Sequence, residues 1–302
     1  MHPIPRLASL LLALVPAAAG ASLQVVTTTD GLAALARDVG GDRVAVTALS
    51  HGNQDPHFVD PNPNLAVKLR DADLLVDVGL DLEIGWLPPL VNQSRNAGIQ
   101  PGNERRFTAA SAIRVLDVPT GPVDRSLGDL HPAGNPHFLD DPPRAVEVAQ
   151  ALAAKLAALD PAGAAGYRAR AADFARRIGA DEKRWLATLA PFRGQAIIAK
   201  HPTVTYLARW AGLRIVGYLE PKPGVEPPPS HLAEMVEVAR AQKVRAILVE
   251  TYYDTRTAAL VAKLSGARVA SIPGDVGASR TATGYEAYMD EVVKGLAGAL
   301  AP

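Results

Sequence analysis

The chain has 302 residues, and its 48% hydrophobic content is enough to build two cores of ordinary size. Its formal charge is zero and its basic residues are dispersed, which argues against binding to nucleic acid or to an anionic membrane surface. It contains no cysteine, which excludes disulfides, thiolate catalysis and zinc–thiolate sites.

The first 21 residues are predicted to be an export signal rather than part of the fold. Arg6 supplies the positive end, residues 7–15 form an apolar run, and residues 19–21 are small, as at a cleavage site. The run is shorter than the roughly 20 residues that span a bilayer. An uncleaved N-terminal anchor is the alternative. Because no cysteine is present to carry a lipid, we expect cleavage near Ala21 and a free periplasmic protein without stable membrane insertion.

After the signal the sequence alternates between strand and helix patterns. Asp30 is placed to cap the first helix, and Pro88-Pro89 interrupt or shorten the third. The predicted strands of this first part are 23–26, 44–49, 74–78 and 113–118, and the predicted helices are 30–39, 64–71 and 82–95.

The middle of the chain has a different character. Residues 143–190 carry no strand pattern and are rich in alanine, with a break at Asp160-Pro161. Asp160 suits a helix cap and Pro161 suits a first turn, which predicts a helix over 161–190, about 45 Å long at 1.5 Å per residue. We interpret it as a rigid strut between two lobes. Two shorter helices broken near Gly179 are the alternative.

Strand and helix patterns alternate again beyond Pro191. The predicted strands are 196–199, 213–219, 244–249 and 267–272, and the predicted helices are 203–211, 230–242, 255–265 and 283–300. The whole chain therefore predicts an α/β fold of two βα lobes, with mostly parallel four-stranded sheets joined by one long rigid backbone helix. We place the first lobe at 22–159, the linking helix at 160–191 and the second lobe at 192–302.

Three histidines follow predicted strands or lie in short proline-bounded loops. Asp55-Pro56-His57-Phe58 and Asn135-Pro136-His137-Phe138 are nearly the same motif, and His201 lies in Lys200-His201-Pro202. Ligands of parallel α/β sheets bind beyond the carboxyl ends of the strands, so imidazoles from both lobes are expected to meet in the cleft between them. Neutral imidazole suits zinc and other late first-row metal ions. The histidines therefore predict a metal site.

A tetrahedral site needs a fourth donor. Asp275 follows the last predicted strand between two glycines that let the backbone turn sharply, and it is the preferred candidate. Glu250, at the end of the preceding strand, is the competing carboxylate, and water is the third possibility. His131, in the same loop as His137, is interpreted as a supporting partner of the ligands or as part of a weaker second site.

The chain resembles the zinc/manganese class of periplasmic solute-binding proteins of ABC metal importers, also called cluster A-I, and the zinc type in particular. The segments that carry the resemblance are Asp55-Pro56-His57, 72–76, 79–83, Asn135-Pro136-His137-Phe138, Lys200-His201 and Val249-Glu250. The resemblance implies two lobes bridged by a rigid helix, one divalent metal ion in the cleft, and its delivery to an inner-membrane ABC permease. The family's ligands fall on His57, His137, His201 and Asp275.

The chain departs from the family pattern in two places, and the second concerns the assignment of the fourth ligand. The His-rich acidic loop of many zinc-binding members is absent, and Asp275 lies in Gly-Asp-Val-Gly rather than an Asp-Pro-Leu-Gly-like turn. Manganese-binding members tend to use two histidines and two carboxylates. Three histidines and one carboxylate therefore favour Zn²⁺ over Mn²⁺ as the transported ion. We expect a monomer that is not an enzyme.

Two other functions compete with metal capture. A zinc hydrolase would need an open coordination position and a general base, for which Glu250 is available. The sequence has no HExxH motif, nucleophile elbow or phosphate-binding glycine loop. A binding protein for a metal chelate would need an aromatic or arginine-lined pocket, and aromatic residues are only 5% of this chain.

Overall fold

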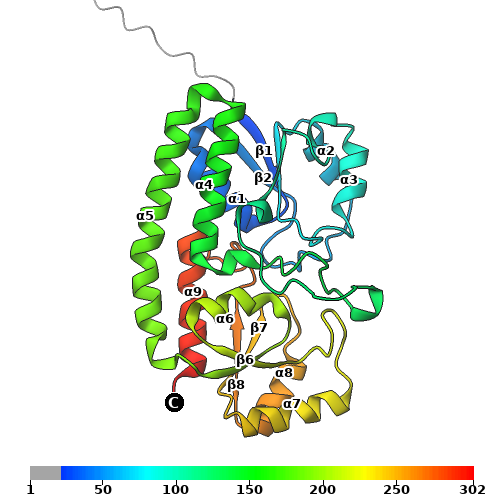
Figure 1. The fold of residues 1–302 in the computed structure, drawn as a ribbon, viewed down its shortest axis with the longest axis vertical. Coiled ribbons are helices and arrows are strands. Elements are labelled where there is room, and N and C mark those ends of the chain that lie inside the picture. Colours follow the sequence, from blue (N-terminus) through cyan, green and yellow to red (C-terminus); the bar gives the residue numbers. More distant parts are fainter. Residues whose placement is uncertain (1–21) are drawn as a thin grey trace, which may run out of the picture.

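The computed structural model describes residues 22–302, and the predicted signal peptide at 1–21 lies outside the described residues. Two parallel four-stranded sheets form the centres of two lobes (Figure 1). The first sheet has the order β2-β1-β3-β4 and the second has the order β6-β5-β7-β8, so both lobes share one strand order. The strands are β1 (Leu23–Thr27), β2 (Val44–Ala48), β3 (Leu74–Asp77), β4 (Arg106–Thr108), β5 (Ala196–Ala199), β6 (Arg214–Tyr218), β7 (Ala246–Glu250) and β8 (Arg268–Ile272).

The predicted α/β architecture is confirmed, and most helices lie within a few residues of their predicted bounds. The helices are α1 (Asp30–Gly40), α2 (Pro63–Arg70), α3 (Leu87–Ser94), α4 (Pro142–Leu159), α5 (Ala164–Leu189), α6 (Thr205–Ala211), α7 (Pro229–Ala241), α8 (Arg256–Ser265) and α9 (Tyr285–Leu300). Pro88 and Pro89 shorten the predicted helix rather than interrupt it: α3 begins at Leu87 instead of residue 82, and the prolines lie in its first turn, where a missing N–H breaks no helical hydrogen bond.

The predicted fourth strand at 113–118 is wrong. The fourth strand is β4, which pairs with β3 through Leu75 and Arg106. Residues 113–118 form no ladder because their backbone groups have other partners. Leu116 N–H donates to the Tyr206 hydroxyl of the second lobe at 2.8 Å, and Leu116 C=O accepts from Asn135 N–H at 2.9 Å. The segment thus ties the two lobes together instead of extending a sheet.

The cap of α1 also differs from the prediction. Thr29 is the N-cap, and its hydroxyl accepts the Leu32 N–H at 3.3 Å. Asp30 is the next residue and lies in the first turn of the helix. Threonine and aspartate are both good caps, so the sequence alone does not choose between adjacent candidates.

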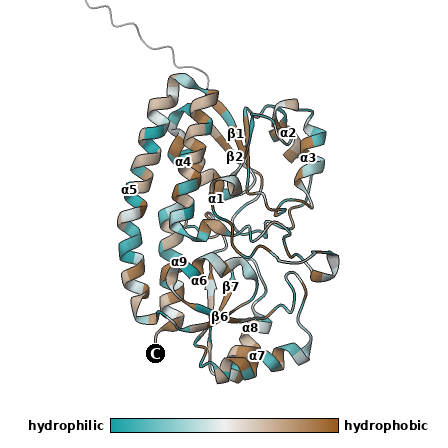
Figure 2. Cartoon of the chain, in the orientation of Figure 1, coloured by the Kyte–Doolittle hydropathy of each residue, from teal (hydrophilic) through white to brown (hydrophobic). Residues whose placement is uncertain are grey.

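Helix α5 is continuous over 26 residues, about 39 Å at 1.5 Å per residue, and has no break at Gly179. A short 3-10 turn at Pro161–Gly163 precedes it. In Figure 1, α5 runs along both lobes, and it packs against α1, α4 and α9. Figure 2 shows hydrophilic and hydrophobic segments alternating along this helix. Its buried side chains recur at helical spacing and form one stripe: Tyr167, Ala171, Phe174, Ile178, Trp185 and Leu189.

One continuous hydrophobic cluster joins the two lobes. It contains strand residues of both sheets, such as Val25 and Leu248, together with the inner faces of α4, α5 and α9. Polar contacts reinforce this packing, since the Tyr285 hydroxyl donates to Leu139 C=O at 2.7 Å and the Tyr288 hydroxyl donates to the Asp140 carboxylate. The lobes are therefore attached by a shared core rather than by a bare linker. Within residues 22–302, no helix combines the length and apolarity needed to cross a membrane.

The Asp140 carboxyl in this interface titrates abnormally. Burial raises its pKa to about 8, and the nearby Glu250 and Asp275 carboxylates add to the rise. The folded protein therefore holds a proton at Asp140 that the unfolded chain releases above its ordinary pKa of 3.8. As the pH rises from about 4 to about 8, this group lowers the free energy of unfolding.

We predict that Asp140→Asn reduces the loss of stability between pH 5 and pH 8, because asparagine keeps a side-chain oxygen for Tyr288 but does not titrate. Thermal unfolding at both pH values measures the effect. Glu104→Gln, at an exposed carboxylate, is the control. An equal fall in melting temperature for wild type and Asp140→Asn would contradict the prediction.

Candidate metal centre

His57 and His137 are held by two copies of the same turn. Asp55 Oδ1 accepts both the backbone N–H of His57 at 3.0 Å and its ring Nδ1–H at 2.7 Å. Asn135 Oδ1 accepts the equivalent groups of His137 at 3.0 and 2.9 Å. The proline between the two residues has a restricted φ and no N–H that would compete for the oxygen. Each turn therefore fixes both the backbone and the ring of its histidine.

His201 reaches the same region from the second lobe. It follows β5, and Glu220 follows the adjacent parallel strand β6, so the two residues emerge side by side. Glu220 Oε2 accepts the Nδ1–H of His201 at 2.7 Å, and the Glu220 amide donates to Lys200 C=O at 3.2 Å. The His201 side chain is buried.

The three predicted histidines converge. One ring nitrogen each from His57, His137 and His201 lies within 4.8 Å of the other two. Their ring centroids are 5.2 to 5.6 Å apart. Because each Nδ1 already donates to a protein oxygen, the Nε2 atoms are the ones left to bind a ligand. His137 Nε2 is buried and has no hydrogen-bond partner within residues 22–302. Such an orphaned acceptor fits a site built for a cation.

Burial favours the neutral, metal-binding form of two of the histidines in this region. Burial lowers the pKa of His137 well below its ordinary value, and charge on the neighbouring His57 and His201 would lower it further. Burial likewise lowers the pKa of His131 to about 4, with the same two neighbours contributing. Neutral imidazole is the ligating form, so these positions need little proton release before binding.

Asp275 lies outside this group of histidines. Its Oδ2 accepts the Gly31 amide at 2.9 Å at the start of α1, and its Oδ1 accepts the amide of Val276 at 2.8 Å. Burial raises its pKa to about 7. Both oxygens are therefore occupied by backbone donors, and the carboxylate would have to leave α1 to reach an ion held by the histidines.

Glu250 also lies outside the group. The Thr203 hydroxyl donates to its Oε1, while its Oε2 is buried and has no hydrogen-bond partner among the described residues. Burial raises its pKa to about 7. Because this oxygen is available, Glu250 still competes with Asp275 for the position of fourth ligand.

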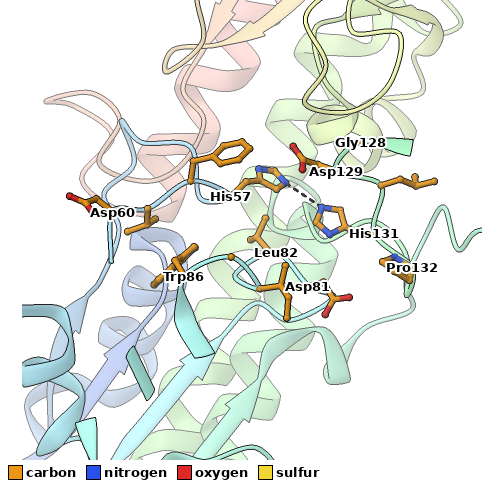
Figure 3. Close-up of a pocket in the computed structure, with 14 residues that line it drawn as sticks. His57, Asp60, Asp81, Leu82, Trp86, Gly128, Asp129, His131 and Pro132 are labelled. Carbon is orange, nitrogen blue, oxygen red and sulfur yellow. Dashed lines mark hydrogen bonds between the residues drawn. The ribbon is translucent and has the colours of Figure 1, made fainter. Parts of the chain in front are cut away.

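His131 lies closer to the three converging histidines than its sequence context indicated. Its Nε2 lies 3.2 Å from His57 Nε2, and the two rings stack with centroids 5.3 Å apart. Figure 3 shows these two rings next to each other in the lining of a pocket that Asp81, Leu82 and Trp86 also line. This pocket has a volume of about 760 Å³. His131 also lines a second pocket of about 300 Å³ with His137 and His201.

Sequence reasoning missed the residues that orient the three histidines. Asp55 and Asn135 stand two positions before a histidine in a repeated motif, which was the available signal for both. Glu220 stands directly after a strand, as His201 does, but nothing in the sequence shows that β5 and β6 are neighbours. Metal-binding histidines commonly donate their second nitrogen to such oxygens.

A family profile described as "Zinc-uptake complex component A periplasmic" matches residues 25–299. The zinc-binding lipoprotein AdcA of Streptococcus pneumoniae is 24% identical over 255 residues, covering 83% of this chain and 49% of AdcA. This chain therefore spans about half the length of that relative. The manganese ABC transporter substrate-binding lipoprotein PsaA of Streptococcus pneumoniae is 25% identical over 248 residues, covering 80% of this chain and 76% of PsaA.

The fold matches as well. The crystal structure of ZnuA superposes with a TM-score of 0.77 at 23% identity, covering 93% of this chain and 100% of that one. The names of these relatives describe binding and transport components, and none of them names an enzyme. Since the family profile covers nearly all of the described residues, the chain belongs to the family of periplasmic zinc-uptake component A.

Proposed function

We propose that this protein captures a divalent metal ion, Zn²⁺ as its main cargo, in the periplasm and delivers it as a monomer to an inner-membrane ABC permease. The observation that carries the proposal is the convergence of His57, His137 and His201 from both lobes, with each Nδ1 bonded to a protein oxygen. Relatives in the family are named for zinc and for manganese, so the family alone leaves the metal open. The donor chemistry favours zinc, because three imidazoles form a nitrogen-rich site.

The three histidines are the proposed ligands, and their partners set the charge of the site. The Asp55 and Glu220 carboxylates each bond a ligand ring, which raises the electron density on the nitrogen that binds the ion. Asn135 holds its ring without adding charge. From the sequence, Asp275 stays the predicted fourth donor. To take this role, its carboxylate would have to release the Gly31 amide at the start of α1.

A hydrolase function is disfavoured, because the relatives of this protein are named as metal-uptake and metal-binding components. Capture and delivery of an ion also need no catalytic turnover. Glu250, the residue available as a general base, is engaged by the Thr203 hydroxyl. A chelate-binding role is disfavoured by the closeness of the three rings, whose centroids leave space between them for an ion rather than for a larger ligand.

We predict that His137→Ala lowers the affinity for Zn²⁺ by about 100-fold or more, because it removes a buried donor that no other residue replaces. Competition with a chromophoric zinc chelator measures the dissociation constant for Zn²⁺. His51→Ala is the matched control, since the His51 ring is exposed and lies near Asp30, away from the three histidines. Wild-type affinity in His137→Ala would refute the proposed site.

Removal of an orienting carboxylate should have a smaller effect. We predict that Glu220→Gln weakens Zn²⁺ binding by about 10- to 100-fold, because the His201 ring keeps a hydrogen-bond partner but loses its negative one. Isothermal titration calorimetry with Zn²⁺ tests this. Glu226→Gln, at an exposed carboxylate that also faces Lys200, controls for a general loss of charge. An unchanged dissociation constant for Zn²⁺ in Glu220→Gln would show that the His201–Glu220 pair contributes nothing to metal affinity.

The shared core predicts little movement between the lobes on binding. Because the chain has no cysteine, spin labels can be attached at Gln93→Cys on α3 and Glu237→Cys on α7 without background. We expect the label-to-label distance to change by no more than a few ångströms when Zn²⁺ is added. A large hinge closure would contradict a rigid connection through α5 and the continuous cluster.

A further inference from the structure

We propose that His131 supplies the fourth ligand, so that the bound ion is held by four imidazole nitrogens. This inference rests on the proposed function and extends it, because it names the donor that completes the site. It replaces both carboxylate candidates in the conformation of this structure.

The first observation is the distance between His57 Nε2 and His131 Nε2, which is 3.2 Å. Two nitrogens bound to one tetrahedral Zn²⁺ at about 2.0–2.1 Å are separated by about 3.3–3.4 Å. The two atoms are therefore already spaced as two ligands of one ion. Five of the six ring pairs among the four histidines have centroids 5.2 to 6.2 Å apart.

The second observation is that both rings have other neighbours in the protein. His57 donates Nδ1–H to Asp55, which leaves a lone pair on its Nε2 in the neutral ring. The His131 ring lies beside the backbone of Leu80. The two Nε2 atoms face each other, and two facing lone pairs repel unless a proton or a cation lies between them.

The third observation is that two segments near the His131 ring are held in place: the turn at 79–81 and the loop that carries His131. Gly79, Leu80 and Asp81 form a turn with three successive positive φ angles, and the buried Glu83 carboxylate holds it by accepting the Val78 and Gly79 amides at 2.7 and 3.1 Å. The loop that carries His131 is tied to the second lobe. Its Asp129 N–H donates to Pro223 C=O at 2.8 Å.

The geometry also shows what must change on binding. The nitrogens of His57, His137 and His201 are up to 4.8 Å apart, and His131 lies outside that tight group. All four rings must contract towards the ion to reach the spacing of a tetrahedral site. To join the same ion, Asp275 would have to give up the Gly31 and Val276 amides.

An all-imidazole site has a direct consequence for selectivity. Manganese prefers oxygen donors, and a site with four nitrogens and no carboxylate discriminates against it. A carboxylate at position 131 should therefore shift the balance towards Mn²⁺.

The test counts imidazole ligands. Wild type, His131→Ala and Asp275→Asn are loaded with one equivalent of Zn²⁺ or Co²⁺ and examined by X-ray absorption and visible spectroscopy. We expect four imidazoles in wild type and Asp275→Asn and three in His131→Ala, with an altered Co²⁺ spectrum and about 10- to 100-fold weaker Zn²⁺ binding in that variant. His131→Asp should raise the Mn²⁺ affinity relative to Zn²⁺, and His51→Ala is the control.

Three outcomes overturn the inference. Three imidazoles in wild type would assign the fourth position to another donor. A weaker Zn²⁺ constant in His131→Ala with an unchanged Co²⁺ spectrum would make His131 a positioning residue only. If Asp275→Asn loses as much Zn²⁺ affinity as His131→Ala, Asp275 would again be the better candidate for the fourth ligand. In each case His57→Ala must still lose Zn²⁺; if it binds as tightly as wild type, the proposed function fails together with the inference.

Discussion

The hydrogen bond from the Nδ1 of His57, His137 and His201 to a protein oxygen is the interaction on which the proposed centre depends. It selects one tautomer of each imidazole, fixes the plane of each ring, and leaves each Nε2 as an acceptor. The partners differ in chemistry: a carboxylate at Asp55, an amide at Asn135 and a carboxylate at Glu220. Without these bonds the same three rings would rotate among several orientations, and their convergence would cost conformational entropy on binding.

The sheets place these turns, and the shared core keeps them in register. β5 and β6 run in parallel, so their carboxyl ends deliver His201 and Glu220 together. His57 and His137 come from loops of the first lobe, and Leu116, Tyr206 and Asn135 connect that lobe to the second. A site made from two lobes keeps its geometry only if the lobes keep theirs, which the continuous hydrophobic cluster provides.

Much of this arrangement could be predicted from the sequence. The alternating strand and helix patterns determined two parallel sheets, and the repeated Asp-Pro-His and Asn-Pro-His motifs pointed to His57 and His137. The strand at 113–118 was mispredicted because an apolar run specifies an extended backbone but not its partners. The position of Asp275 was not predictable either, since a glycine-flanked aspartate suits a metal turn as well as the start of α1. Adjacency between elements, as for Glu220 and His131, is a tertiary property that local patterns do not carry.

The hydrophobic cluster that both lobes share has a consequence for how the molecule loses its structure. Each lobe also has a smaller cluster of its own, but the largest apolar interior includes residues of both sheets and of α4, α5 and α9. Denaturation should therefore proceed as one cooperative transition rather than lobe by lobe. An ion bound where the halves meet then stabilises all 281 described residues, from 22 to 302, at once.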